Sequence, residues 1–216
     1  MSNITLPKAR IFWAILLPAL LLVACSDTTE YQKDKHYSEF TNIIDDVIIN
    51  HPELNEIQVL EFFTYGCSHC KAFAPQLKKW GVAKESNIKY VPIVWNDVTD
   101  LHARAYYLIE NHENFNELHS GLFELVADFS RTDSMDDQKI KLITWFQEQG
   151  IQPIDALNAF NSTIFEQELA LSVLLSKRFQ VTSTPTLVVN NTYRINNKAM
   201  TSQKDLLKVA EKIMAK

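Results

Sequence analysis

Residues 58–73 read QVLEFFTYGCSHCKAF, and this stretch decides the fold that we expect. Its first part belongs to a short apolar run, residues 57–64, which is typical of a buried strand. A helical pattern follows over 67–85, so Cys67 and Cys70 lie just after a strand and in the first helical turn. Residues 88–95 indicate a second strand. Strand, helix and strand in this order predict a right-handed βαβ unit.

The rest of the chain changes character twice. From about 98 to 180, apolar residues recur at helical spacing, which predicts an all-helical block. Strand character returns at 186–189 and 192–195, with Asn190-Asn191 suited to the tight turn between them. An amphipathic helix over 202–215 ends the chain. We therefore predict an α/β domain formed by 56–97 and 181–216, interrupted by a helical insertion at 98–180.

The composition excludes several classes of function. The net charge is -5, whereas nucleic-acid-binding proteins usually need a basic surface. The same sign gives no reason to expect electrostatic binding to anionic lipid. The chain has only 4 glycines and neither a G-x-G-x-x-G nor a G-x-x-x-x-G-K-[ST] motif, so a phosphate-binding loop is not indicated. We expect no bound cofactor and no nucleic-acid partner.

The N-terminal residues are typical of a targeting segment. Lys8 and Arg10 precede an apolar run at 11–24, which is the plan of a secretory signal. The run ends Leu-Val-Ala before Cys25 and resembles the lipobox of bacterial lipoproteins. That resemblance implies that 1–24 is a removed lipoprotein signal and that Cys25 carries the lipid. The alternatives are a plain signal peptide and an uncleaved anchor. Residues 25–55 would then form a lipid tether and an N-terminal segment, in an oxidising envelope compartment.

The pair Cys67 and Cys70, separated by Ser68 and His69, suits disulfide exchange. A Cys at a helix N-terminus is favoured as thiolate by the unpaired backbone N–H groups and the helix dipole. We therefore predict that Cys67 attacks, that Cys70 is the buried resolving thiol, and that the His69 imidazole stabilises the thiolate. Zinc would need ligands that the chain does not offer near this pair. A structural disulfide across two residues would contribute little stability.

Two further features are placed to serve the cysteines. Thr184-Pro185 stands before the strand at 186–189, and an X-Pro bond there is the usual position of a cis peptide that presents the Thr184 backbone to an extended substrate. A trans proline that merely starts the strand is the alternative. Glu61 lies inside the apolar run, where an acid usually has a partner or a function. It could relay a proton to Cys70, with Lys89 as electrostatic partner, or it could face solvent at a sheet edge.

The other histidines show no metal-ligand pattern, and we expect them at surface or hydrogen-bonded polar positions: His36, His51, His102, His112 and His119.

These residues resemble the DsbA family of periplasmic dithiol oxidases. The similarity rests on QVLEFFTYGCSHCKAF and on 182–190, which resembles that family's cis-Pro loop and following strand. It implies a thioredoxin fold with a helical insertion. It also implies Cys67 as nucleophile, Cys70 as resolving Cys, His69 as thiolate stabiliser, Pro185 as the cis-Pro and Glu61 as the family's buried acid. Reoxidation by a DsbB-like, quinone-linked membrane protein is implied as well.

Two departures bear on the direction of catalysis. Ser68 stands where the enterobacterial protein has Pro, and Thr184 stands where it has Val. Our leading hypothesis is a monomeric, membrane-tethered oxidase that donates its disulfide to exported proteins with free cysteines. The alternative is a disulfide isomerase or reductase kept reduced by an electron donor. A non-catalytic chaperone or binding module is the third hypothesis.

Overall fold

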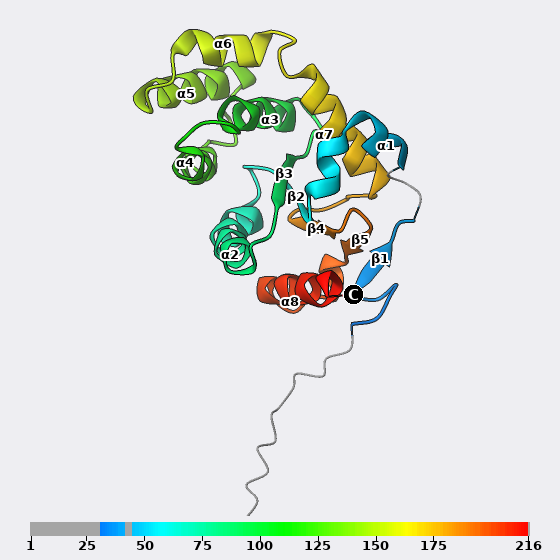
Figure 1. The fold of residues 1–216 in the computed structure, drawn as a ribbon. Helices are drawn as coiled ribbons and strands as arrows, with labels where there is room; N and C mark the ends of the chain where they lie inside the picture. Colours follow the sequence, from blue (N-terminus) through cyan, green and yellow to red (C-terminus); the bar gives the residue numbers. More distant parts are fainter. Residues whose placement is uncertain (1–30, 42–44, 216) are drawn as a thin grey trace, which may run out of the picture. The chain divides into compact units, whose positions relative to one another are not determined.

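The computed structural model describes residues 31–41 and 45–215 (Figure 1). Its sheet has five strands in the order β1-β5-β4-β2-β3. Strands β2 and β3 pair in parallel, and the other neighbours pair antiparallel. The strand bounds are Tyr37–Glu39 (β1), Val59–Phe63 (β2), Ile88–Pro92 (β3), Thr186–Val189 (β4) and Tyr193–Ile195 (β5).

Helices α1 (Asp45–Asn50) and α2 (Ser68–Lys84) precede the insertion, and α8 (Gln203–Met214) closes the chain. The helices between are α3 (Asp97–Ile109), α4 (Phe115–Ala127), α5 (Met135–Glu148), α6 (Pro153–Asn161) and α7 (Glu166–Arg178). Short 3-10 turns occur at Pro52–Glu56 and Asn197–Ala199. The predicted order of βαβ, helices and ββα is therefore confirmed.

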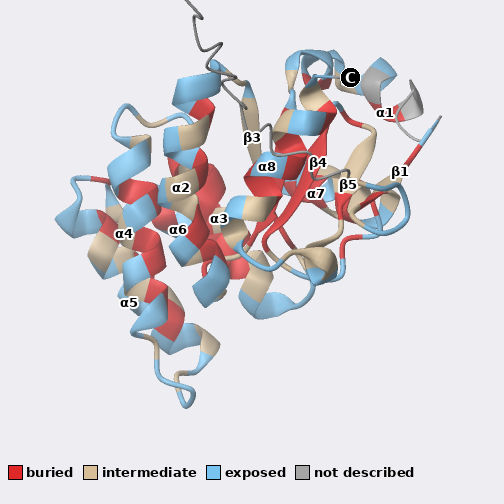
Figure 2. Ribbon diagram, turned by 90° about the horizontal axis from the view of Figure 1, so that it is seen from below, coloured by how far each residue is buried: buried red, intermediate tan, exposed pale blue. Residues whose placement is uncertain are grey.

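Two layers of helices cover the sheet because the strand residues alternate between its faces. Helices α2 and α8 bury Phe73, Leu77 and Val209 against Val59 and neighbouring strand residues. The opposite face of the sheet, which includes Leu60 and Phe62, packs on α1 and α7. Figure 2 shows the buried residues along β4 and on the inner sides of the helices. The N-terminus of α2 consequently emerges at the end of β2.

The helical insertion forms its own apolar core, which continues into the residues around the cysteine pair. Phe63, Tyr65 and Cys70 belong to the same buried cluster as Tyr106, Leu122 and other residues of α3–α6. Local signals start and stop these helices. Asn96 and Ser134 form capping boxes at the starts of α3 and α5, and Gly150 follows α5 with a φ of 86°. The turn at Asn190 and Asn191 has positive φ at both residues, as predicted.

Strand β1 and helix α1 were not predicted from the sequence, whereas α6 falls in the predicted helical block. Strand β1 pairs with β5 and extends the sheet. It lies within residues 25–55, which the sequence analysis assigned to a lipid tether and N-terminal segment. Helix α6 begins at Pro153 in the first helical turn, a position that suits proline. The proposed signal at 1–24 and the lipid site Cys25 lie outside the described residues. Within the described ranges, none of the helices has the length and apolar character needed to span a bilayer.

Gly121 is a position where we expect a methyl group to destabilise the fold. A Cβ there would lie 2.5 Å from Cζ2 of Trp145, a rigid ring held between α4 and α5. We expect Gly121→Ala to lower the free energy of unfolding by roughly 1–2 kcal/mol, measured by urea denaturation. Gly81→Ala is the matched control, because its Cβ would meet only the flexible end of Ile88. Equal stability of the two variants would contradict this reading.

Candidate active site

Cys67 is the N-cap residue of α2, so its thiol lies where the helix has unpaired N–H groups. The backbone N–H of Cys70 donates to the Cys67 Sγ at 3.3 Å. Both thiols are free; Cys67 is half-buried and Cys70 is buried. The turn thus gives the two sulfur atoms different surroundings, with only the first open to an incoming substrate.

The two thiols have opposite pKa shifts. The pKa of Cys67 is lowered to about 5, and the largest cause is the hydrogen bond from the Cys70 thiol. Partial burial opposes this shift. Hydrogen bonds from the Thr184 side chain and from the backbone N–H groups of Cys70 and His69 lower the pKa further. Burial and the nearby Cys67 raise the pKa of Cys70 well above its usual range. Cys67 is therefore a thiolate at neutral pH, whereas Cys70 keeps its proton.

The Thr184–Pro185 peptide bond is cis, in agreement with the prediction from the cysteine motif. The loop faces the cysteines, because the Thr184 carbonyl oxygen lies 3.5 Å from the Cys67 Sγ. Pro185 is buried and Thr184 is half-buried. The Thr184 backbone thus lies beside the Cys67 sulfur, where an extended chain could pair with it.

A cavity of about 380 Å³ adjoins this loop. Its walls come from the α2 N-terminus, the cis-Pro loop and the start of α8; they include His69, Thr184, Pro185, Met200 and Leu206. The Gln203 side-chain amide donates to the His69 carbonyl oxygen at 2.6 Å and accepts from Gln76 at 3.0 Å. Gln203 thus ties α8 to the active-site turn, a role that its sequence position, 134 residues from His69, did not reveal.

Glu61 lies inside β2 and is 1% exposed, which rules out the edge position in solvent. Burial, then repulsion from Cys67, raises its pKa from 4.5 to about 8. Its expected pairing with Lys89 is wrong. Lys89 is in register with Leu60, so it lies on the other face of the sheet, and its ammonium binds Glu110 at 3.1 Å. Glu61 is in register with Tyr90 instead, and it raises the pKa of that phenol, after the larger effect of burial.

Replacing Glu61 should stabilise the protein in alkaline solution. Because the folded-state pKa lies above the unfolded value, ionisation of Glu61 destabilises the fold increasingly from pH 4.5 to about 8. For Glu61→Gln in the oxidised form, we expect a gain of roughly 2–4 kcal/mol at pH 8 and little change at pH 4.5. Urea unfolding at both pH values measures it, with exposed Glu124→Gln as control. A difference independent of pH would contradict a buried, titrating Glu61.

Two histidines expected at surface or hydrogen-bonded positions are buried beside the site. His119 Nδ1 forms a 2.8 Å hydrogen bond with the Tyr65 hydroxyl, two residues before Cys67. The Cε1 atom of the His102 ring would lie 3.9 Å from the Cβ of any side chain placed at Gly66, next to Cys67. Burial lowers the pKa of His102 to about 4 and that of His119 to about 3, so both rings are neutral at pH 7. The apolar neighbours Leu101 and Ala103 of His102, and Leu118 of His119, were the signal that the sequence analysis did not use.

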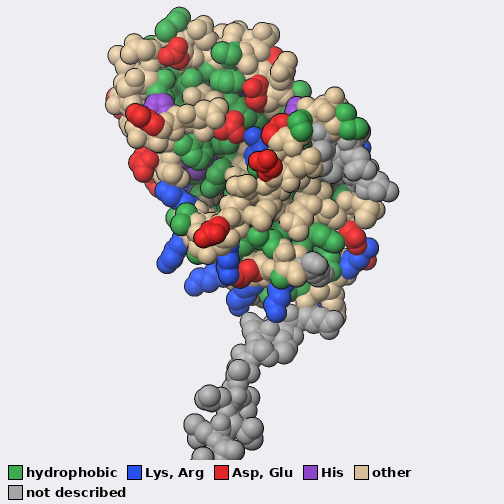
Figure 3. All heavy atoms as spheres, viewed as in Figure 1, with side chains coloured by type: hydrophobic (Ala, Val, Ile, Leu, Met, Phe, Trp, Pro, Cys, Tyr) green, Lys and Arg blue, Asp and Glu red, His purple; other side chains and the backbone are tan. Residues whose placement is uncertain are grey.

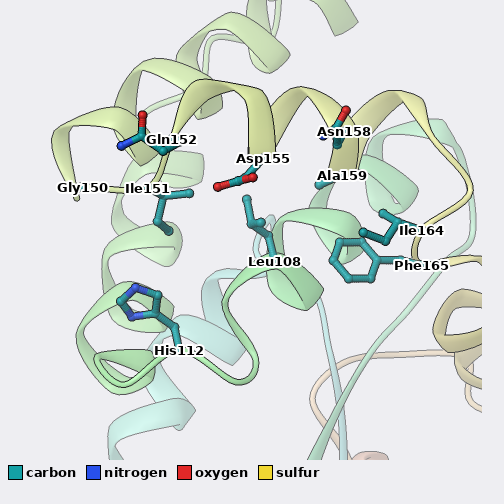
Figure 4. Close-up of a pocket in the computed structure, with 10 residues that line it drawn as sticks. All are labelled: Leu108, His112, Gly150, Ile151, Gln152, Asp155, Asn158, Ala159, Ile164 and Phe165. Atoms are coloured by element: carbon teal, nitrogen blue, oxygen red, sulfur yellow. The ribbon is translucent and has the colours of Figure 1, made fainter.

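A second cavity of about 380 Å³ lies wholly within the helical insertion (Figure 4). Leu108, Ile151 and Phe165 form apolar walls, and Asp155 and His112 add polar groups. Figure 4 shows the side chains of Asp155 and Leu108 pointing toward one another. None of the lining residues belongs to the cysteine turn or the cis-Pro loop, so this cavity is not part of the candidate active site.

Comparisons with known proteins agree with this site. No family model matches the chain. It is 25% identical over 207 residues to the thiol:disulfide interchange protein DsbA of Pseudomonas syringae pv. tomato, covering 94% of this chain and 92% of that protein. It is 24% identical over 208 residues to DsbA of Pseudomonas aeruginosa, covering 95% of each.

Solved structures show the same fold. The crystal structure of Pseudomonas aeruginosa DsbA matches with a TM-score of 0.69 at 23% identity, over 86% of this chain and 95% of that one. The oxidoreductase DsbA from Xylella fastidiosa matches with a TM-score of 0.66 at 24% identity, over 84% and 96%. These matches confirm the thioredoxin fold with a helical insertion. Along nearly its whole length, the chain is therefore similar in sequence to DsbA proteins, and it has their fold.

Proposed function

We propose that the chain is a thiol-disulfide oxidoreductase that donates the Cys67–Cys70 disulfide to exported proteins with free cysteines. The observation that carries the proposal is the difference between the two thiols: the pKa is lowered at half-buried Cys67 and raised at buried Cys70. A stable Cys67 thiolate favours the reduced enzyme, and its disulfide is therefore a good oxidant. This observation and the DsbA relatives favour donation over the isomerase or reductase alternative.

Donation takes two exchange steps. A substrate thiolate attacks the Cys67 sulfur of the oxidised enzyme; a mixed disulfide forms, and the bond to Cys70 breaks. Cys70 leaves as a thiolate and takes up a proton, in keeping with its raised pKa. A second substrate thiolate then attacks the substrate sulfur of the mixed disulfide and releases the Cys67 thiolate. The substrate loses two electrons and gains a disulfide, and the enzyme's disulfide is reduced.

Neighbouring residues have roles that fit this sequence of steps. Glu61, protonated at neutral pH, supplies the proton to Cys70. The Thr184 backbone beside cis-Pro185 aligns the substrate chain. Ser68 and His69 are exposed between the cysteines and tune the thiolate, His69 through its N–H and, as the sequence predicts, through its imidazole.

The proposed location is the periplasmic side of a bacterial membrane. The lipobox-like run before Cys25 supports a lipid anchor there. We further propose that the protein is a monomer and that a DsbB-like, quinone-linked membrane oxidase reoxidises it. Intact-mass analysis of the protein purified from membranes tests the anchor. The expected result is a lipid-modified Cys25 at the N-terminus; an unmodified chain that begins elsewhere would contradict it.

Stoichiometric disulfide transfer tests the activity. We expect one equivalent of oxidised protein to convert a reduced two-cysteine peptide to its disulfide. Mass spectrometry of the peptide and of the protein measures the conversion. The enzyme should end fully reduced. If the peptide stays reduced while the protein instead unscrambles a mispaired substrate, the isomerase alternative would replace donation.

A further inference from the structure

We propose that α2 and α8 form a basic face that binds the headgroups of anionic phospholipids in the membrane that anchors the chain. The inference rests on the lipid anchor proposed at Cys25. The basic face consists of the exposed side chains of Lys78, Lys79, Lys204, Lys208 and Lys212. Figure 3 shows lysine and arginine side chains gathered over the region of these two helices.

The net charge of the chain hides a strong separation of charge. Helices α2 and α8 together carry seven lysines and only two carboxylates. Helices α3–α7 carry ten carboxylates against five basic residues. The net charge of -5 alone gave no reason to expect binding to anionic lipid, but it does not report this distribution. A local cluster, rather than the total charge, sets the attraction to a charged surface within a Debye length.

The two helices present these lysines in one layer. Gln76 binds Gln203, and Lys84 pairs with Glu211, so α2 and α8 run side by side in the same direction. Lys204, Lys208 and Lys212 recur every four residues and form one stripe opposite the buried face of α8.

The carboxylates nearby are engaged within this layer. Asp205 accepts from the Thr201 hydroxyl and pairs with Lys208 at 3.9 Å, and Glu211 pairs with Lys84. The lysine charges of the layer therefore exceed what its own acids neutralise.

An exposed apolar side chain favours lipid over a water-soluble acidic partner. Val82 is 75% exposed, and it lies three residues after Lys79 on the same side of α2. A short apolar side chain among lysines suits the boundary between headgroups and acyl chains, where lysine stems also lie on apolar surface. This pattern is that of an amphipathic surface on a membrane.

Chain length keeps this layer near the bilayer. Tyr31 packs against the apolar cluster that α8 shares with α2, and Cys25 precedes it by six residues. Six residues span at most about 21 Å, so Tyr31 lies within that reach of a lipid at Cys25. Cys67 begins α2, about 18 Å along the helix from Lys79. Contact of the basic face with lipid would hold the active site close to a membrane-embedded reoxidant.

Lysine labelling on the full-length protein tests the proposal. The protein purified from membranes is reconstituted in vesicles of phosphatidylcholine, with or without phosphatidylglycerol, and treated with an impermeant amine-acylating reagent. With phosphatidylglycerol at low salt, we expect labelling of Lys79, Lys204, Lys208 and Lys212 to slow by about tenfold. High salt should restore it. Lys139 and Lys177 of the insertion are controls in the same sample and should not change.

A pair of triple variants provides the matched comparison. Changing Lys204, Lys208 and Lys212 to Gln should abolish the protection of Lys79, whereas changing Lys139, Lys141 and Lys177 to Gln should preserve it. Equal labelling in both vesicle types, with the protein still anchored, would overturn the basic face and leave the anchor intact. Protection that appears only in native membranes and never in pure lipid would also overturn it, in favour of a protein partner.

Failure of the anchor gives a separate result. If Cys25 proves unmodified, the same protein is mixed with preformed vesicles. Salt-sensitive binding to phosphatidylglycerol vesicles that the Lys204, Lys208 and Lys212 variant loses would support the basic face without the anchor. Absence of binding would overturn it.

Discussion

Cys67→Ser is expected to reduce disulfide donation to the uncatalysed background. The serine hydroxyl can neither form a disulfide with Cys70 nor receive a substrate sulfur, so both exchange steps are lost. Stopped-flow measurement of peptide oxidation, with wild-type protein as reference, records the loss. Residual turnover well above background would mean that Cys67 is not the attacked sulfur.

Cys70→Ser is the control for this variant. The Cys70→Ser variant keeps Cys67 as the N-cap residue of α2, with the backbone N–H of residue 70 donating to its sulfur, but it removes the resolving thiol. A substrate disulfide should therefore accumulate as a mixed disulfide on Cys67, visible by mass spectrometry. If the trapped adduct instead formed on Cys70 in Cys67→Ser, the two roles would be reversed.

The reduced protein is expected to lose stability relative to the oxidised protein as the pH falls from 7 to 5. The folded-state pKa of Cys67, about 5, lies below its usual value of 9.0. The stabilisation by its thiolate is therefore complete above pH 9 and is lost as the pH falls to about 5. With allowance for partial exposure, the loss between pH 7 and 5 is roughly 2 kcal/mol, or roughly 4–8 °C in Tm.

Thermal unfolding of both redox forms across this pH range measures the effect. The difference between the forms removes the contribution of buried groups such as His119, whose pKa is lowered by burial alone and which titrate alike in both. The reduced Cys67→Ser variant is the control, and its stability should follow the same pH dependence as that of the oxidised protein. A redox difference that stays constant between pH 7 and 5 would contradict the lowered pKa of Cys67.

The elements around the cysteine motif could be predicted because their apolar patterns are strong and local. The apolar run containing Val59 and Phe62 predicted β2. The Thr184-Pro185 dipeptide, taken together with the cysteine motif at Cys67, predicted the cis-Pro loop. Strand β1 could not be predicted, because three residues carry too little pattern and its existence depends on pairing with β5.

The error at Lys89 shows that a position on the neighbouring strand does not by itself predict a side-chain contact. Lys89 and Glu61 lie on neighbouring strands, but register puts their side chains on opposite faces of the sheet. Gln203 and His119 reach the active-site turn from more than 50 residues away, through contacts that no periodicity reports. The basic face was hidden for the same reason, since α2 and α8 are adjacent only in space.

The equilibrium potential of the Cys67–Cys70 couple in glutathione buffers tests the central claim most directly. Because the Cys67 thiolate stabilises the reduced form, the account predicts an oxidising couple, nearer the established DsbA value of about -120 mV than the thioredoxin value of about -270 mV. A potential close to that of thioredoxin would contradict donation and would direct attention to an electron donor and to substrates that need reduction.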